Sequence, residues 1–283
     1  MLGSKAPASR RVAAVALLIA ASLTARPASA ETPHWPTTVT AVYKITYLGV
    51  DIGSFQFAST IHGSTYSLSG DAQLSALLGA FTWKGSTRTS GTLAGESMRP
   101  AGYNFDFKSN SKSGSVKIGF NEAGVSNLSV VPPSNPSPEH VPLREPHLKQ
   151  VLDPLSAVMA ISRNPGASPC GRKVSIFDGK QRFDLHLSFR GQQRVVETRP
   201  SGQPGFAYVC RVRYIPIAGH RNNDESKQMA DNANIELALR PVPSANLLIP
   251  YRISIPTFAG AAVMTAQRVE ITTQGKAQIA LMH

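Results

Sequence analysis

Five polar side chains are the candidates for acid–base chemistry: Asp178, Arg182, Asp184 and His186, which are close in the sequence, and His220 further along. A carboxylate beside a histidine can transfer protons. Each of these residues also has a structural explanation, because Asp178 stands in a turn and the next three alternate along one face of a strand. No serine lies in a Gly-x-Ser-x-Gly elbow, and no histidines have His-Glu-x-x-His spacing. We therefore predict no catalytic residue, no metal site and no cofactor, and a hydrolase is the least favoured of the functional alternatives.

The N-terminus has the pattern of an export signal. Basic residues at Lys5, Arg10 and Arg11 precede an apolar run at 12–23, and Ala28-Ser29-Ala30 forms a small-x-small cleavage site. We expect a signal peptide at 1–30, cleavage near Ala30 and a periplasmic protein. The pair Arg10-Arg11 leaves both general secretion and twin-arginine export open. The run is too short for a transmembrane helix, which needs roughly 20 residues, so we expect no transmembrane anchor.

The chain has two cysteines, Cys170 and Cys210. An oxidising compartment favours a disulfide between them. Such a bond would close a loop of 40 residues and stabilise the fold by about 4 kcal/mol on the loop-entropy model. The alternative is a zinc site, but histidines at ligand spacing are missing from the sequence around both cysteines.

A helix is predicted at 153–163. Asp153 is a good N-cap, Pro154 suits the first helical position, and apolar residues including Leu155 and Met159 recur at helical spacing. We expect this helix to lie over or inside a curved sheet, either as core packing or as a movable lid. In the second case Leu155 and Met159 would contact a ligand.

Most of the remaining chain alternates with the period of a strand. Phe55, Phe57, Ser59 and Ile61 share one face, and Asp178-Gly179 favours the turn of a hairpin. Leu74 to Phe81 breaks the alternation and is expected to be a short helix or a loop. The fold class is therefore mainly β: an antiparallel curved sheet, or a partial or closed β-barrel, with one amphipathic helix.

Two proline-containing regions limit the strand order. The stretch 131–146 contains six prolines and is expected to be an extended surface loop or linker between two halves of one domain spanning 31–283. Pro250 and Pro256 are expected to confine their strand to a sheet edge or a barrel rim. The polar segment 221–234 is expected to be a mobile loop near that rim.

Several short motifs resemble those of the domain of unknown function 3108 family of bacterial exported proteins. They are Asp153–Ala157, Cys170-Gly171, Ile176–Leu185 with its Phe-Asp-Gly-x-x-Arg string, Tyr214–His220, and, nearer the start, Tyr47-Leu48-Gly49, Ile52-Gly53 and Arg99-Pro100. The resemblance runs from about Tyr43 to Ile271. It implies an envelope location and a curved antiparallel sheet or partial barrel, and it implies no catalytic residues.

Charge limits the class of partner. The predicted signal peptide contains four basic residues and no acidic one, which leaves 25 of the 29 Lys and Arg against 17 Asp and Glu. These charges are scattered, and the chain lacks a basic helix or an aromatic-basic sheet motif, so nucleic acid is not an expected partner. The excess suits a solvated surface or attraction to anionic envelope material.

Two functional classes follow. The first is a non-catalytic periplasmic carrier that binds a lipid or other amphiphile between helix and sheet, with basic residues meeting an anionic headgroup. The candidate ligand residues are Leu155, Met159, Trp83, Arg88, Arg182, Tyr214 and His220. The second is a structural or interaction component of the envelope, which contacts a protein partner through a sheet edge or the proline-rich loop. A large apolar cavity favours the first class, and a filled core favours the second.

Overall fold

Alternating inward and outward residues form antiparallel strands along most of the chain. The computed structural model describes Gly3 and residues 35–76, 79–95, 97–133, 138–163, 166, 168–257 and 260–283. Apart from Gly3, the predicted signal peptide lies outside these residues. Residues 35–283 group into one compact unit.

The described strands are β1 Thr38–Tyr47, β2 Val50–His62, β3 Thr65–Ala76, β4 Phe81–Ala94, β5 Ser97–Ser109, β6 Ser113–Asn121, β7 Gly124–Val131, β8 Arg172–Phe177, β9 Arg182–Arg194, β10 Phe206–Ala218, β11 Glu236–Val242, β12 Leu247–Thr257, β13 Gly260–Thr272 and β14 Ile279–Met282. The described helices are α1 Pro154–Ser162, α2 Asp224–Asp231 and the 3-10 turns η2 Glu145–Leu148 and η3 Pro243–Ala245.

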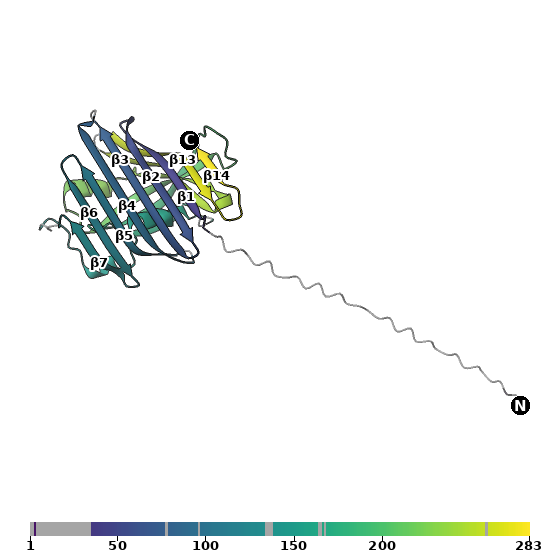
Figure 1. Ribbon diagram of the computed structural model, residues 1–283, viewed down its shortest axis with the longest axis horizontal. Coiled ribbons are helices and arrows are strands. Elements are labelled where there is room, and N and C mark those ends of the chain that lie inside the picture. The colour runs from purple at the N-terminus through teal and green to yellow at the C-terminus, as the bar shows by residue number, and fades with distance from the viewer. Residues whose placement is uncertain are drawn as a thin grey trace. The chain divides into compact units, whose positions relative to one another are not determined.

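In the described residues these strands form one 14-stranded sheet (Figure 1). Its order is β7-β6-β5-β4-β3-β2-β1-β13-β12-β11-β10-β9-β8, with β14 paired to β13, and every strand pairing is antiparallel. The expectation of a curved antiparallel sheet is confirmed. A closed barrel is wrong, because β7 and β8 end the order without pairing to each other.

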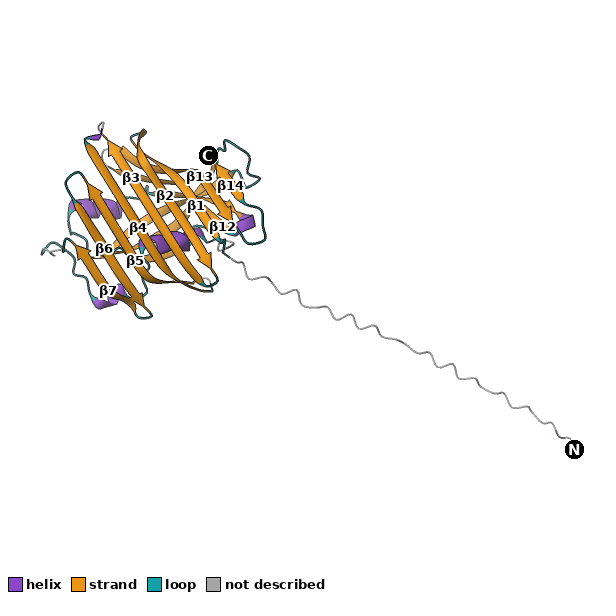
Figure 2. Cartoon of the chain, viewed as in Figure 1, coloured by secondary structure: helices purple, strands orange, loops and turns teal. Residues whose placement is uncertain are grey.

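Helix α1 lies behind the strands that are in front in Figure 2, against the inner face of the sheet. It contacts β3, β4 and β5 on one side and β8 and β12 on the other. The predicted N-cap is correct: the Asp153 carboxylate accepts hydrogen bonds from the backbone N–H groups of Leu155 and Ser156, both at 3.0 Å. The helix therefore occupies the space that the curved sheet surrounds.

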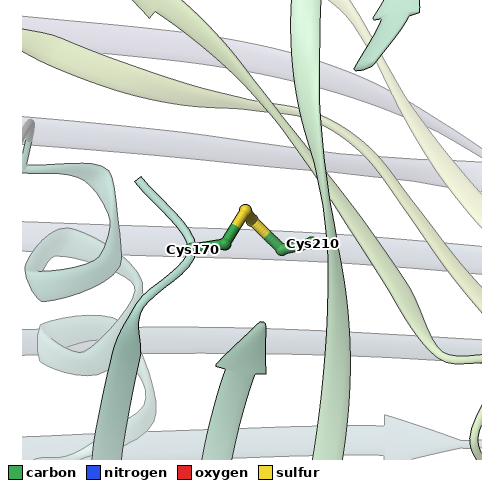
Figure 3. The surroundings of a disulfide bond; sticks show 2 residues. All are labelled: Cys170 and Cys210. Atoms are coloured by element: carbon green, nitrogen blue, oxygen red, sulfur yellow. A yellow bond between two sulfur atoms is a disulfide. The ribbon is translucent and has the colours of Figure 1, made fainter. Parts of the chain in front are cut away.

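The disulfide between Cys170 and Cys210 is present, with the two Cα atoms 5.4 Å apart (Figure 3). Cys170 stands just before β8 and Cys210 lies in β10, so the bond links two strands that are separated by β9. Both cysteines are fully buried. They belong to a core cluster with Ile176, Leu187 and Val212.

Of the two places expected for the strand with Pro250 and Pro256, a sheet edge is wrong. β12 lies between β11 and β13, and Pro250 pairs with Leu239 directly after a register shift in β11. A bulge at this point accommodates a residue that has no N–H to donate. The bulge therefore allows Pro250 to lie in a strand that has neighbours on both sides.

Two other local expectations differ from the structure. Leu74 to Ala76 belong to β3 and Phe81 begins β4, so the expected short helix or loop is wrong at both ends of that stretch; residues 77–78 lie outside the described set. The segment 221–234 contains α2, which Asn223 caps by accepting a hydrogen bond from the backbone N–H of Ser226 at 3.0 Å. No helix in the described part of the chain is long and apolar enough to span a membrane.

Candidate functional site

An apolar cavity of about 310 Å³ lies between α1 and the concave face of the sheet. One wall comes from β1 and β2, a second from β9 to β13, and α1 closes a third side. Ligand pockets in proteins typically hold 300–1,000 Å³, so this cavity lies at the small end of that range. The lining residues are Trp35, Pro36, Val39, Ala41, Tyr43, Phe55, Phe57, Ser59, Ile61, Leu155, Val158, Met159, Ile161, Ser162, Leu185, Val212, Tyr214, Met229, Ile235, Leu237, Leu247, Ile249, Pro250, Ile253, Ile255, Met264 and Val269.

The cavity wall follows β12 over much of that strand. Its lining residues on β12 run from Leu247 to Ile255, which is roughly 26 Å at about 3.3 Å per residue. An extended apolar chain could lie along a wall of this length.

The wall bears no charge. Among the described residues that line the cavity, none is Asp, Glu, Lys, Arg or His. An ionised group placed inside would lose its hydration without gaining a counter-charge, which is very costly. Any part of a ligand that enters the cavity is therefore uncharged.

The polar groups on the wall are hydroxyls and the indole N–H of Trp35, which is buried and has no hydrogen-bond partner among the described residues. Tyr214 donates its hydroxyl hydrogen to Oε1 of Gln181 at 2.9 Å and is already paired. Ser162 is half-buried, whereas Tyr43 and Ser59 are only 5% and 6% exposed. Desolvation raises the pKa of Tyr43 well above its ordinary value, so its hydroxyl stays protonated.

One end of the cavity lies under α2. Met229 of α2 lines the cavity and is 36% exposed, and Val158 of α1 is 37% exposed. Nδ2 of Asn232, just after α2, donates to the carbonyl oxygen of Pro256 at 2.8 Å. This hydrogen bond connects the segment after α2 to the end of β12. We call this end, formed by α2 and the ends of β10 and β12, the rim.

The other end is better covered. Trp35, Ile61 and Leu247 line it, and the last two are buried. The guanidinium of Arg163 lies 4.9 Å from the centre of the Trp35 ring. A molecule entering the cavity would therefore enter from the rim.

Polar contacts hold the helical wall in place. Asp153 is fully buried and accepts a hydrogen bond from the Thr89 hydroxyl of β4 at 3.1 Å. The hydroxyl of Ser156 lies 2.9 Å from that of Tyr66 in β3. The Arg172 guanidinium donates to the carbonyl oxygens of Ala160 and Arg163 at the other end of the helix. These bonds favour the interpretation of α1 as a fixed wall over that of a movable lid.

Three of the predicted ligand residues meet at the cavity. Leu155 and Met159 line it from α1, and Tyr214 lines it from β10. The two α1 residues are 4% exposed and also pack into a core cluster with Ile61, Tyr66 and Met98.

Trp83 and Arg88 lie elsewhere. Trp83 is half-buried, with its ring centre 6.4 Å from that of Phe105. Arg88 is exposed and forms an ion pair with Asp71 at 3.1 Å. Five positions separate Trp83 from Arg88, so in a regular strand the two side chains point to opposite faces. They do not form a common rim.

Arg182 and His220 are also outside the cavity wall. Arg182 forms an ion pair with Asp184 at 2.6 Å and donates to the carbonyl oxygen of Phe183. His220 follows β10, and burial lowers its pKa below the ordinary value, with His140 adding to the effect. Neither residue is placed to meet a ligand in the cavity.

The polar cluster first considered for acid–base chemistry has structural roles. Asp178 accepts hydrogen bonds from the N–H groups of Lys180 and Gln181 and closes the turn between β8 and β9. Burial alone would raise the pKa of Asp184, but hydrogen bonds from Arg182 and from Ser175 and Lys173 on β8 lower it below the ordinary value. A carboxylate held in this way is a weak proton acceptor.

Sequence reasoning missed several wall residues. Phe55, Phe57 and Ser59 were assigned to one strand face, but the alternation did not reveal that this face borders a cavity. Nothing in the sequence indicated that Met229 would line a cavity, because the segment that forms α2 is polar and was expected to be a loop. Val158 belongs to the apolar stripe predicted for the helix, but it was not named among the ligand residues, and in the structure it is the exposed member of α1.

A second hollow, of about 410 Å³, lies over the ends of β2 to β5. Most of its lining side chains are small, polar and exposed, among them His62, Thr65, Ser67 and Thr92. The Tyr66 hydroxyl at its base is paired with Ser156. We regard the apolar cavity as the candidate site because it is enclosed on three sides.

Comparison with protein-family models shows which family the chain belongs to. Residues 42–267 match the family model described as "Protein of unknown function (DUF3108)". The chain belongs to the DUF3108 family. Neither the curated proteins nor the solved structures contain a match. The matched region of this DUF3108 protein runs from β1 into β13 and includes α1, both cysteines and most of the cavity wall.

Proposed function

We propose that this DUF3108 protein is an exported, non-catalytic carrier that holds the apolar part of a lipid or other amphiphile in the cavity beside α1. The observation that supports the proposal is the cavity itself, about 310 Å³ in volume and without a charged side chain among its described lining residues. A structural protein of this size would ordinarily fill such a space, because protein interiors are closely packed.

The energetics are adequate for reversible binding. Each buried CH2 group gains about 0.8 kcal/mol, so about ten such groups gain about 8 kcal/mol before the entropic cost of association. Since about 8 kcal/mol corresponds to a micromolar dissociation constant and the cost of association reduces it, the net affinity from ten such groups is weaker than micromolar, which suits a carrier that must release its cargo. The headgroup would remain at the rim, in contact with water.

The proposed location is the periplasm, with a mature chain of 31–283 as one domain. The N-terminal signal pattern and the disulfide both support export, because disulfides persist in oxidising compartments. An anionic headgroup is not required by the geometry, since Arg88 and Arg182 are engaged in ion pairs away from the cavity.

Cavity filling tests the proposal. N-phenyl-1-naphthylamine, which fluoresces in apolar surroundings, should bind the wild-type protein saturably. Val158→Trp places a large ring in the cavity at a side chain that is already partly exposed, and it should weaken dye binding at least 10-fold. Val196→Trp is the matched control, because Val196 is exposed and lies outside the cavity wall. Equal affinity in the two variants, or no saturable binding to the wild type, would count against the proposal.

One observation favours a second candidate, an envelope component that binds another protein. β7 ends the sheet, and its residues Leu128 and Val131 are exposed. An unpaired strand edge can accept an additional strand from another chain. Recovery of a stoichiometric protein partner together with an empty cavity would favour this candidate.

A further inference from the structure

The Tyr43 hydroxyl is a polar group that the fold does not use. Tyr43 lies on β1, opposite Phe55 of β2, and its ring packs 6.0 Å from the Phe55 ring. It lines the cavity and is 5% exposed. No hydrogen bond from this hydroxyl to another described residue is found, and burial is the only influence on its pKa. The hydroxyl oxygen is accessible from the cavity and is not sealed in the core, so a molecule in the cavity can supply the partner that a protein hydroxyl ordinarily has.

Other buried hydroxyls on this inner face differ from Tyr43. The Tyr66 hydroxyl is bonded to Ser156 and the Tyr214 hydroxyl to Gln181. Ser59 is as buried as Tyr43, but a serine hydroxyl is short and can turn to a nearby backbone carbonyl. The rigid ring of Tyr43 holds its hydroxyl away from its own backbone, so a molecule in the cavity is in position to accept a hydrogen bond from it.

The position of Tyr43 shows where along a bound chain that partner would lie. Ser59 pairs with Val39, and Phe55 pairs with Tyr43. These two residue pairs are four residues apart along each strand, which is roughly 13 Å at about 3.3 Å per residue. Tyr43 is thus nearer to the rim, and Ser59 is nearer to the covered end.

Resting on the proposed carrier function, we propose that the ligand is an acyl ester whose uncharged carbonyl oxygen accepts a hydrogen bond from the Tyr43 hydroxyl. The uncharged wall excludes a carboxylate at this level, and the protonated phenol supplies a donor. The acyl chain would run from Tyr43 toward Ser59 and Ile61. The alcohol part of the ester would extend toward the rim.

A matched pair of probes tests this assignment. Methyl dodecanoate and tetradecane have chains of equal length, and the ester adds the carbonyl oxygen. Each is titrated as a competitor of N-phenyl-1-naphthylamine against the wild type and Tyr43→Phe. The ratio of the alkane to the ester dissociation constant should fall about 10-fold in Tyr43→Phe, because the lost hydrogen bond stabilises the ester alone. Tyr208→Phe, which removes a hydroxyl from the concave face outside the cavity wall, should leave the ratio unchanged.

The outcomes separate the two proposals. If both probes bind and the ratio is the same in wild type and Tyr43→Phe, the ester assignment is overturned and the cavity remains a binding site. If neither probe displaces the dye, and the dye itself does not bind, the carrier proposal fails and the ester assignment fails with it.

A second measurement applies if Tyr43→Phe does not fold. Methyl dodecanoate carrying a 13C-labelled carbonyl is bound to wild-type protein, and its infrared carbonyl stretch is recorded. Hydrogen bonding lowers that frequency relative to the ester in an alkane solvent. A bound ester that absorbs at the alkane-solvent frequency would overturn the assignment.

Discussion

Asp153 is completely buried, and its carboxylate accepts three hydrogen bonds. Its carboxylate caps α1 through the N–H groups of Leu155 and Ser156 and accepts from the hydroxyl of Thr89. Desolvation raises the pKa of Asp153 above its ordinary value, although these hydrogen bonds act in the opposite direction. Asp153 therefore holds α1 in position, at the free-energy cost of keeping a charged carboxylate buried.

The sign of the resulting pH effect follows from linkage. An acid whose pKa is higher in the folded state binds its proton more tightly there, so its contribution to stability falls as pH rises from about 3.9, the unfolded pKa, to the folded value. Asp153→Asn keeps a capping oxygen and has no charge to desolvate. Its free energy of unfolding relative to wild type should therefore increase with pH across that window.

Urea unfolding of both proteins at several pH values between about 3 and 7 checks this prediction. At neutral pH Asp153→Asn should be as stable as the wild type or more stable. Asp153→Ala, which leaves two N–H groups without a cap, should lose about 2 kcal/mol. A stability difference between Asn variant and wild type that shrinks as pH rises would show that the carboxylate stabilises the fold.

Some individual residues of the site were predictable from the sequence. Leu155, Met159 and Tyr214 were assigned from apolar spacing, and spacing does report which face of an element a residue occupies. Trp83 and Arg88 were grouped by proximity in sequence, whereas strand geometry places residues five apart on opposite faces. The unpaired hydroxyl of Tyr43 was not foreseeable, because pairing depends on neighbours from other strands.

Among the elements, α1 and the β8–β9 hairpin were well defined by their sequence signals. Asp153-Pro154 marked the helix start, and Asp178-Gly179 marked the turn. α2 was missed because its eight residues are mostly polar and contain no apolar stripe. Pro250 was misread because a bulge, which sequence alone does not show, removes the need for its missing N–H.

The disulfide fixes the outer strands of the C-terminal half. It connects the segment before β8 to β10, and both sulfur-bearing residues are buried among apolar side chains. The sequence separation of 40 residues corresponds to about 4 kcal/mol on the loop-entropy model. We expect the double variant Cys170→Ala with Cys210→Ala to lose about that free energy of unfolding.

Urea denaturation of the oxidised wild type and the double variant measures this loss. Thiol titration of unfolded, unreduced wild type should detect no free thiol. Reduced wild type serves as the control for the effect of the substitutions themselves, since it lacks the bond and keeps both cysteines. A double variant as stable as oxidised wild type would mean that packing alone holds these strands.

On the scale of the whole molecule, the open sheet and the inserted helix act together. A sheet that curves without closing leaves an apolar interior too wide for its own side chains, and α1 fills one part of it. The remaining space is the cavity. The fold class was predictable because alternation and turn residues are local signals, whereas the open edge and the unfilled interior depend on the long-range curvature of all the strands.

The most direct test of the carrier account is native mass spectrometry of the protein purified from the cells that produce it, followed by extraction of any bound molecule. The account predicts a chain that begins at Glu31, carries one equivalent of an acyl ester and releases it on unfolding, with less retained by Val158→Trp. A protein that carries no small molecule, and still carries none after incubation with an envelope lipid extract, would contradict the account.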